Sequence, residues 1–218
     1  MRIDHFLRRL MEERPRVVNF LGREIPRSSV ESALYSATAF FLIFNSLSIP
    51  FALPKLRAFV GAPYLPSSRT AFRSVLEHVP DLQREGVKMV DIGSGDGRLV
   101  LEASKRGMAA MGIELNPWLV FVSRIKMRIA GSKAPIMCMN AWKSGPTLEK
   151  FQPDLLTFYG RPGQGVMARF GSLAEELSDR TGKELIVASN KFPIPGWNVR
   201  LIAHVEDFFI YKLHSNRH

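Results

Sequence analysis

The chain has 218 residues with 30 lysines and arginines against 20 acidic residues, a formal net charge of +10, and its length suffices for one well-packed domain with an N-terminal extension. Its single cysteine, Cys138, excludes an internal disulfide framework and a cysteine-rich zinc site, and its five histidines lack metal-ligand spacing, so no metal is expected. The charge suits nucleic acid, an anionic membrane or an acidic partner surface, and does not choose among them.

Residues 1–29 are expected to form a basic leader. The first 27 residues hold seven arginines, no lysine and four acidic residues. Basicity carried by arginine alone resembles a mitochondrial presequence, although four acids are more than such a leader usually has. A targeting segment and a solvated tail are therefore both open.

Residues 30–54 are predicted to associate with a membrane, because residues 32–54 carry no formal charge. A helix over residues 32–49 would rise roughly 27 Å at 1.5 Å per residue, close to the ~30 Å hydrocarbon core of a bilayer. Several serines, Thr38 and Asn45 dilute its hydropathy, and Pro50 is expected to end it. The segment either spans the bilayer or lies on it; a helix packed on the globular domain is the alternative. Basic residues flank both ends, so its orientation is open.

Residues 55–80 are predicted to form a linker followed by a helix. Pro63 and Pro66 stiffen the linker, and Tyr64 between them is a candidate substrate contact. Ser67 or Ser68 can cap a helix over residues 70–79. The apolar residues of that helix fall on one face: Ala71, Phe72, Val75, Leu76 and Val79.

A strand, a glycine turn and a helix start are predicted over residues 90–98. Glycines at positions 93, 95 and 97 give the spacing G-x-G-x-G, whereas the dinucleotide fingerprint G-x-G-x-x-G needs a glycine where Arg98 stands. Asp91, just ahead, would repel a pyrophosphate but suits a ligand that carries an ammonium and a sulfonium group. The turn therefore favours S-adenosyl-L-methionine over NAD, and a tight turn without ligand is the alternative. The predicted cofactor-binding residues are Asp91, Gly93, Ser94, Gly95 and Gly97.

Two further strand ends supply cofactor candidates. Glu114 closes an apolar run over residues 109–115, where a carboxylate can accept both hydroxyls of a ribose. Asn116 and Pro117 then start a helix over residues 118–130, a role that capping alone would explain. After a third strand, at 136–139, the Asn140 carbonyl can accept the adenine amine and the Trp142 indole can stack on the ring; core packing of Trp142 is the alternative.

The fourth strand, over residues 155–159, ends in Phe158 and Tyr159, the candidates for the channel of the methyl acceptor. Tyr159 is expected to orient the target amine, because ligands collect at the carboxyl ends of such strands. Helices at 99–106 and 166–177, a strand at 184–189 and a closing hairpin at 199–213 complete the pattern. Strands alternating with helices before an antiparallel hairpin predict an α/β, Rossmann-like methyltransferase domain over residues 81–218.

Four segments resemble the mitochondrial protein-lysine N-methyltransferases that modify the c-subunit of ATP synthase and the adenine nucleotide translocase. They read DIGSGDGRLVLEA at 91–103, GIELNPWLV at 112–120, PYLPS at 63–67 and FPIPGW at 192–197, within a resemblance over residues 61–213. The resemblance implies the class I, seven-strand fold and S-adenosyl-L-methionine as cofactor. It also implies an uncleaved N-terminal apolar segment for targeting and membrane attachment.

The same resemblance implies methylation of a lysine in a protein of the mitochondrial inner membrane, with the ATP synthase c-subunit favoured over the translocase. The protein is then expected at that membrane, with its catalytic domain facing the matrix. Two rivals stay open. An RNA methyltransferase suits the charge, but no appended RNA-binding module is apparent, so nucleic acid is not expected as a partner. A membrane-tethered assembly factor that binds S-adenosylmethionine without catalysis is the other.

Overall fold

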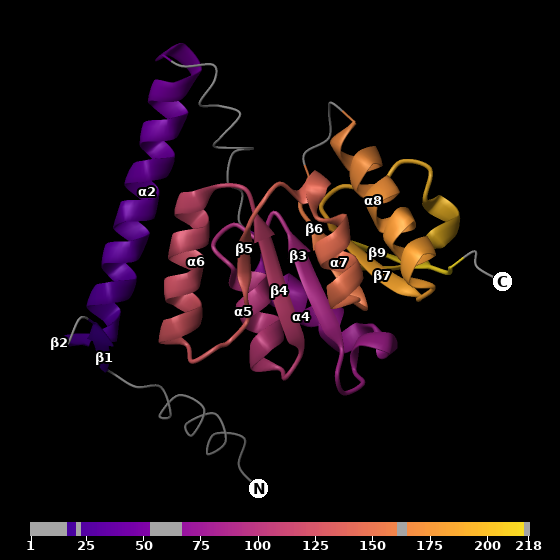
Figure 1. Cartoon of the computed structure of the whole chain (residues 1–218), viewed down its shortest axis with the longest axis horizontal. Helices are drawn as coiled ribbons and strands as arrows, with labels where there is room; N and C mark the ends of the chain where they lie inside the picture. Colours follow the sequence, from indigo (N-terminus) through magenta and orange to yellow (C-terminus); the bar gives the residue numbers. More distant parts are fainter. Residues whose placement is uncertain (1–16, 21–22, 53–66, 161–164, 216–218) are drawn as a thin grey trace, which may run out of the picture. The chain divides into compact units, whose positions relative to one another are not determined.

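The computed structural model describes residues 17–20, 23–52, 67–160 and 165–215 (Figure 1). The chain divides into two compact units, Met1–Arg57 and Ala58–His218. The boundary falls in the stretch for which the sequence predicts a linker.

The first unit contains a hairpin and one long helix. Strands β1 (Val17–Phe20) and β2 (Arg23–Pro26) pair antiparallel, with Val18 opposite Ile25. Helix α2 (Arg27–Ala52) follows directly. The hairpin was not expected within a basic leader, and α2 continues through Pro50, where the sequence predicted its end. Pro50 removes one backbone hydrogen bond of α2, and only two residues of the helix follow it, so the sequence placed the end of α2 about one turn or less too early.

Among the residues that the structure describes, no helix combines the length and the hydropathy that crossing a bilayer requires. The predicted bilayer-spanning helix is therefore not found there. Within α2 the Thr38 hydroxyl donates to the Leu34 carbonyl at 2.7 Å, so this polar group is satisfied inside the helix.

The second unit is built on a seven-stranded sheet with the order β5-β4-β3-β6-β7-β9-β8. The five strands from β5 to β7 run parallel, and β9 is antiparallel to both β7 and β8. This confirms the predicted parallel sheet with a closing hairpin. The strands are β3 (Lys88–Ile92), β4 (Ala109–Glu114), β5 (Ile136–Cys138), β6 (Leu155–Phe158), β7 (Leu185–Asn190), β8 (Leu201–Val205) and β9 (Phe208–Leu213).

Helices cover both faces of the sheet (Figure 1). Adjacent strand residues alternate between two apolar clusters: Met89 and Leu155 belong to one, Val90 and Leu156 to the other. The first cluster includes α4 (Arg69–His78), α5 (Arg98–Lys105) and α6 (Pro117–Ile129); the second includes α7 (Gly145–Phe151) and α8 (Val166–Thr181). The described residues of this unit also form the 3-10 turns η1 (Pro80–Leu82), η2 (Ala141–Lys143) and η3 (Asn198–Arg200).

Helix starts follow the predicted capping residues. Of the two serines proposed for α4, Ser68 is the cap, and its hydroxyl accepts the Ala71 N–H at 3.2 Å. Asn116 caps α6 by accepting the Trp118 N–H at 3.0 Å, with Pro117 in the first turn. Both helices therefore begin where the sequence places their caps.

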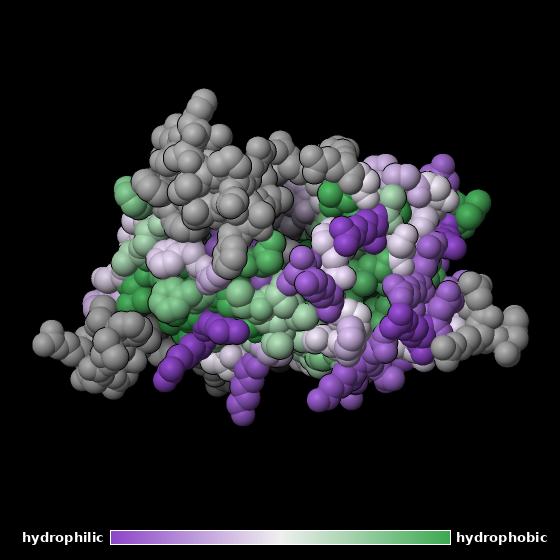
Figure 2. Space-filling view, turned by 45° about the horizontal axis from the view of Figure 1, so that its top comes forward, coloured by the Kyte–Doolittle hydropathy of each residue, from purple (hydrophilic) through white to green (hydrophobic). Residues whose placement is uncertain are grey.

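Some large apolar side chains stay at the surface among charged ones, as the space-filling view shows (Figure 2). In the second unit they come from two places. Leu115, Phe121 and Met137 belong to the β4 end, α6 and edge strand β5, whereas Val199, Leu201 and Ile202 belong to η3 and edge strand β8. The exposed edge strands are short, which limits pairing with other chains.

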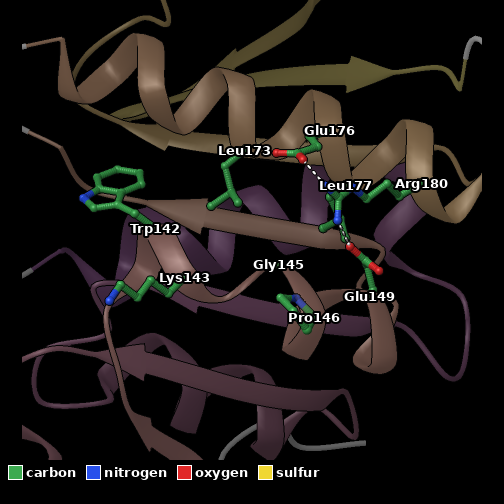
Figure 3. Close-up of a pocket in the computed structure, with 9 residues that line it drawn as sticks. All are labelled: Trp142, Lys143, Gly145, Pro146, Glu149, Leu173, Glu176, Leu177 and Arg180. Carbon is green, nitrogen blue, oxygen red and sulfur yellow. Dashed lines mark hydrogen bonds and ion pairs between the residues drawn. The ribbon is translucent and has the colours of Figure 1, made fainter.

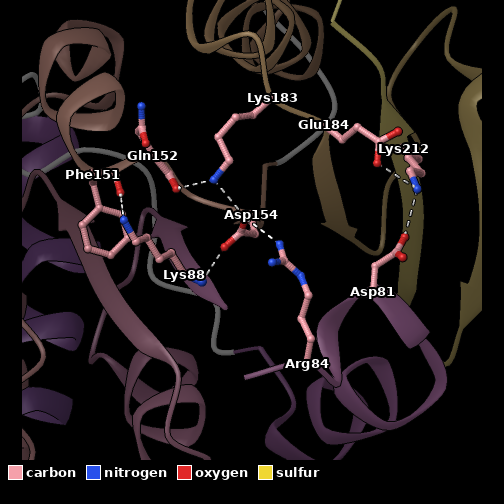
Figure 4. Close-up of polar contacts among 9 residues, drawn as sticks. All are labelled: Asp81, Arg84, Lys88, Phe151, Gln152, Asp154, Lys183, Glu184 and Lys212. Carbon is pink, nitrogen blue, oxygen red and sulfur yellow. Dashed lines mark hydrogen bonds and ion pairs between the residues drawn. The ribbon is translucent and has the colours of Figure 1, made fainter. Parts of the chain in front are cut away.

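The amino edge of the sheet is held by Asp154, which precedes β6 (Figure 4). Its Oδ2 accepts the backbone N–H of Lys88 at 2.8 Å, and its Oδ1 accepts Arg84 Nη2 at 2.8 Å and Lys183 Nζ at 3.1 Å. Burial opposes ionisation of Asp154, but these hydrogen bonds and charges together lower its pKa below the ordinary value. One carboxylate thus ties the start of β3 to the chain leading into β6 and β7.

We expect Asp154→Ala to lower the free energy of unfolding by about 1–3 kcal/mol, because it leaves the backbone N–H of Lys88 without its acceptor and removes the partner of Arg84 and Lys183. The loss should appear as a lower midpoint in urea denaturation at pH 7. Because the folded-state pKa is lowered, this contribution is present above pH ~4 and is lost as the pH falls further. The matched control is Asp81→Ala, which removes the exposed ion pair with Lys212 (3.2 Å) and should cost less than about 1 kcal/mol. Equal effects of the two variants would contradict this role of Asp154.

Candidate functional site

The glycine loop bends at the carboxyl end of β3, as predicted. The backbone N–H groups of Gly93 and Ser94 both donate to the Ile113 carbonyl, at 2.8 and 3.0 Å, and the Gly97 N–H donates to the Ser94 carbonyl at 2.8 Å. Gly93, Gly95 and Gly97 all have positive φ, at 73°, 53° and 73°. The loop therefore needs a backbone conformation that other residues rarely adopt, and it is fixed against the end of β4.

Gly97 also lets helix α6 approach the loop. A Cβ on Gly97 would collide with the Ser123 hydroxyl and would lie 2.9 Å from the Met127 methyl carbon. The Ser123 hydroxyl in turn donates to the Gly95 carbonyl at 3.3 Å. The third glycine of the motif is thus required by packing between loop and helix.

Replacement of Gly97 by alanine is expected to cost more stability than the same change at Gly93. Both positions have φ +73°, but a Cβ at Gly93 meets nothing within 4 Å. Gly93→Ala should cost about 1 kcal/mol for the backbone alone, and Gly97→Ala a further 1–3 kcal/mol or so for the overlap with α6. Thermal unfolding of both variants measures the difference, and equal melting temperatures would show that α6 simply moves away.

Glu114 ends β4 and is hydrogen-bonded to both of its neighbouring segments. Its Oε2 accepts the Gly95 N–H and its Oε1 accepts the Asn116 N–H, each at 2.8 Å. A carboxylate has about four acceptor positions, so each oxygen keeps capacity for another donor. Glu114 thus lies between the glycine loop and the start of α6, and its contact with a ribose stays a prediction.

Asp91 is buried, at 6% exposure, and accepts the Thr157 hydroxyl at 2.7 Å. Burial raises the pKa of Asp91 to about 7, with smaller contributions in the same direction from Glu114 and Asp96, while the Thr157 hydrogen bond opposes the shift. Near neutral pH this carboxyl is therefore partly protonated. A cation bound beside it would favour its ionised form.

Asp96 had no predicted role, and the structure shows that it anchors the loop. It is 3% exposed and accepts Arg98 Nε at 2.9 Å and Lys126 Nζ at 2.6 Å. Burial opposes its ionisation, but Arg98 and Lys126 together hold its pKa well below the ordinary range. Arg98 is two residues away and could have been suspected; Lys126 is 30 residues away on α6, and no sequence signal connects the two.

Asn140 and Trp142 lie after β5, as predicted, and contact each other. The Asn140 carbonyl oxygen accepts the Trp142 backbone N–H at 2.9 Å and caps η2. The Trp142 indole lies beside α7 and α8, at one end of a pocket of about 200 Å³ (Figure 3). The Arg169 guanidinium lies 4.8 Å from its ring centroid. Trp142 thus has packing partners of its own, and the adenine contacts of both residues stay predictions.

That pocket is bounded at its far end by ion pairs from Arg180 to Glu149, at 2.8 Å, and to Glu176 (Figure 3). It lies between α7 and α8, and the glycine-loop residues do not line it. Within the described residues, no group of three or more histidine, cysteine or acidic side chains is placed to hold a metal ion.

The two residues predicted at the end of the fourth strand differ in position. Phe158 is only 8% exposed and stacks on Phe170 of α8, with ring centroids 4.4 Å apart, so the structure gives it a packing role in the core. Tyr159, one residue later, is half-buried; its ring stacks on Phe192 at 6.3 Å, and Lys191 Nζ lies 5.9 Å from its centroid. Tyr159 is thus the more accessible of the two, and its contact with a methyl acceptor stays a prediction. Tyr64 lies outside the described residues.

The family model of the ANTKMT methyltransferase domain matches residues 91–200, from Asp91 to the turn before β8. The ATP synthase C-subunit lysine N-methyltransferase of Xenopus laevis is 32% identical over 154 residues, which are 70% of this chain and 62% of that protein. The adenine nucleotide translocase lysine N-methyltransferase of Mus musculus is 35% identical over 196 residues, 86% of this chain and 78% of that protein. This chain spans less than two thirds of the length of each of the four vertebrate C-subunit enzymes that it matches.

A solved structure with the same fold is an RNA methyltransferase from Salinibacter ruber in complex with S-adenosyl-L-homocysteine. It has a TM-score of 0.56 and 21% sequence identity, and the match covers 71% of this chain and 96% of the other. At that identity the likeness shows the Rossmann-like, class I fold alone. The family model and the mouse relative show more: this chain belongs to the ANTKMT methyltransferase domain family.

Proposed function

We propose that this protein is an S-adenosyl-L-methionine-dependent protein-lysine N-methyltransferase whose substrate is the c-subunit of ATP synthase, with the adenine nucleotide translocase as second candidate. The observation that carries the proposal is the pairing of Glu114 with the Gly95 N–H. This hydrogen bond holds the Glu114 carboxylate, which can accept further hydrogen bonds, beside the glycine loop at the adjoining ends of two parallel strands. The activities for which the relatives are named supply the substrate class.

The residues of this edge fit the proposed cofactor. Glu114 can accept the ribose hydroxyls, and a cationic ligand suits Asp91. The buried Ser94 hydroxyl has no hydrogen-bond partner among the described residues, so it is available to a ligand. The space that a Cβ on Gly93 would point into is open, with no atom within 4 Å of that Cβ. When bound, S-adenosylmethionine supplies a methyl group activated by a sulfonium.

The target lysine must also lose a proton before it can accept a methyl group. A free lysine has a pKa of about 10.4, so deprotonation near pH 7 costs roughly 4–5 kcal/mol. The Lys191 ammonium lies 5.9 Å from the centroid of the Tyr159 ring. Its positive charge disfavours a second ammonium beside it and so lowers this cost. The amine lone pair then forms the C–N bond as the C–S bond breaks, the bonding pair stays on sulfur, and the amine proton leaves to solvent.

Methyl transfer from radiolabelled cofactor to the purified c-subunit and to the purified translocase tests the proposal. We expect label on one lysine of the c-subunit, lost when that lysine is replaced by arginine. Label on the translocase alone would change the substrate but not the reaction. Label that depends on RNA and disappears with nuclease would favour an RNA methyltransferase. Cofactor binding with no turnover on either protein or on mitochondrial extract would favour a non-catalytic assembly factor.

We further propose that the protein acts at the mitochondrial inner membrane, with its catalytic domain facing the matrix. The arginine-rich start of the chain and the uncharged stretch at 32–54 support this location. We expect a variant lacking residues 1–54 to leave the membrane fraction of mitochondria while it keeps cofactor affinity. If that variant still pellets with carbonate-washed membranes, residues 1–54 are not the membrane anchor.

A further inference from the structure

Asn190, the last residue of β7, is a buried polar side chain that the proposed chemistry has not used. It is 1% exposed, and its Nδ2 donates to the Ser67 hydroxyl at 2.8 Å. Its Oδ1 has no hydrogen-bond partner among the described residues. Leaving a buried carbonyl unsatisfied costs about 1–3 kcal/mol, so this oxygen is suited to a donor that arrives with a ligand.

The register of the sheet places Asn190 at the edge where the acceptor would react. Across the sheet Asp91 pairs with Thr157, and Thr157 pairs with Ala188, so these three side chains share one face. Asn190 lies two residues after Ala188 on that same face, further toward the carboxyl edge. Phe158 pairs with Ser189, so the next residues, Tyr159 and Asn190, follow this pair on adjacent strands; Tyr159 lies just past β6, whereas Asn190 still pairs with Phe208 of β9.

The cofactor residues lie at the ends of β3 and β4, whereas Asn190 belongs to β7, beyond β6. Its distance in the sheet order from Glu114 therefore favours the methyl acceptor over the ribose as its ligand. An amide is also suited to an amine: a neutral carbonyl accepts an N–H without stabilising the ammonium form as a carboxylate would.

We propose that Asn190 Oδ1 accepts a hydrogen bond from the ε-amino group of the target lysine, an inference that rests on the proposed lysine methylation. One N–H of the amine is held by this oxygen, and the lone pair is thereby turned toward the methyl group. Nδ2, through Ser67, holds the chain that leads into α4. The Asn190 amide would thus select a methyl acceptor that carries an N–H group and fix the direction of its lone pair.

Three variants test the proposal on the full chain: Asn190→Leu, Asn190→Asp and the matched control Ser67→Ala. Asn190→Leu should lower kcat/KM about 10- to 100-fold with affinity for S-adenosylhomocysteine changed less than about threefold. Asn190→Asp should move the pH dependence of kcat/KM to higher pH, because a carboxylate stabilises the ammonium form of the lysine. Ser67→Ala removes only the hydrogen bond to Nδ2 and should leave the pH profile in place.

The proposal is overturned if Ser67→Ala and Asn190→Leu reduce activity alike while Asn190→Asp leaves the pH profile unchanged, since the amide would then be an anchor. A loss of cofactor affinity in Asn190→Leu comparable with its loss of kcat/KM would assign the oxygen to the cofactor instead. If Asn190→Leu does not fold, the pH profile of Asn190→Asp decides alone. Failure of the proposed function is distinguishable, because it appears as a wild-type protein that methylates neither candidate substrate.

Discussion

Glu114→Ala should lower the affinity for S-adenosylhomocysteine by at least about 100-fold. Two hydrogen bonds from ribose hydroxyls to a carboxylate contribute about 3–5 kcal/mol together, and each 1.4 kcal/mol is a factor of ten in the dissociation constant. The variant also frees the Gly95 and Asn116 N–H groups, which Glu114 holds in place. Isothermal titration calorimetry on the free protein measures the loss.

Two controls separate the ribose contact from a general effect of lost charge. Glu114→Gln keeps one carbonyl acceptor and the side-chain size, so its affinity should fall between those of the wild type and the alanine variant. Glu149→Ala removes an acid from α7 that pairs with the half-exposed Arg180, and cofactor affinity should be unchanged. The assignment of Glu114 would fail if its alanine variant bound within threefold of the wild type.

Cofactor affinity should rise with pH as the pH passes about 7, and this dependence should vanish in Asp91→Asn. In the free protein the Asp91 carboxyl titrates near that pH. A cationic ligand favours its ionised form, so binding at lower pH must release a proton. At pH 8 we expect Asp91→Asn to bind at least about 100-fold more weakly, because a buried charge pair contributes several kcal/mol. Calorimetry in buffers of different ionisation enthalpy measures the proton.

The raised pKa of Asp91 makes the stability of the free protein fall as the pH rises, whereas it makes the cofactor affinity rise. A carboxyl whose pKa is raised by folding favours the folded state below its ordinary pKa and loses that contribution as the pH rises toward 7. Without cofactor, Asp91→Asn should therefore be more stable than the wild type at pH 8, by up to about 4 kcal/mol. Thr157→Val is the matched control: it removes the donor that opposes the shift, so the pH midpoint of binding should move upward. A wild-type affinity that is flat from pH 6 to 8 would contradict both expectations.

Local signals in the sequence predicted much of this architecture. The glycine spacing placed the loop, an acid after an apolar run placed Glu114, and Ser68 and Asn116 placed two helix starts, because each depends on residues a few positions apart. Phe158 was harder to place: adjacent residues at a strand end point to opposite faces, and its packing on Phe170 depends on where α8 lies.

The remaining site contacts join residues far apart in the chain. Lys126 reaches Asp96 from 30 residues away, and Asn190 reaches Ser67 from 123 residues away. Such pairs follow from the order of strands and the approach of helices, which composition and periodicity do not specify. The role of a polar residue at a strand end therefore cannot be assigned from the sequence until the order of the strands is known.

The ion pairs that Asp96 makes with Arg98 and Lys126 also bear on how ligands enter and leave. Because they anchor the glycine turn to its neighbouring helix without help from a ligand, the conformational entropy of ordering that turn is lost during folding rather than at each encounter. Association with the adenosyl donor should then be a single kinetic phase, and turnover need not wait for the turn to reorganise between one product and the next donor.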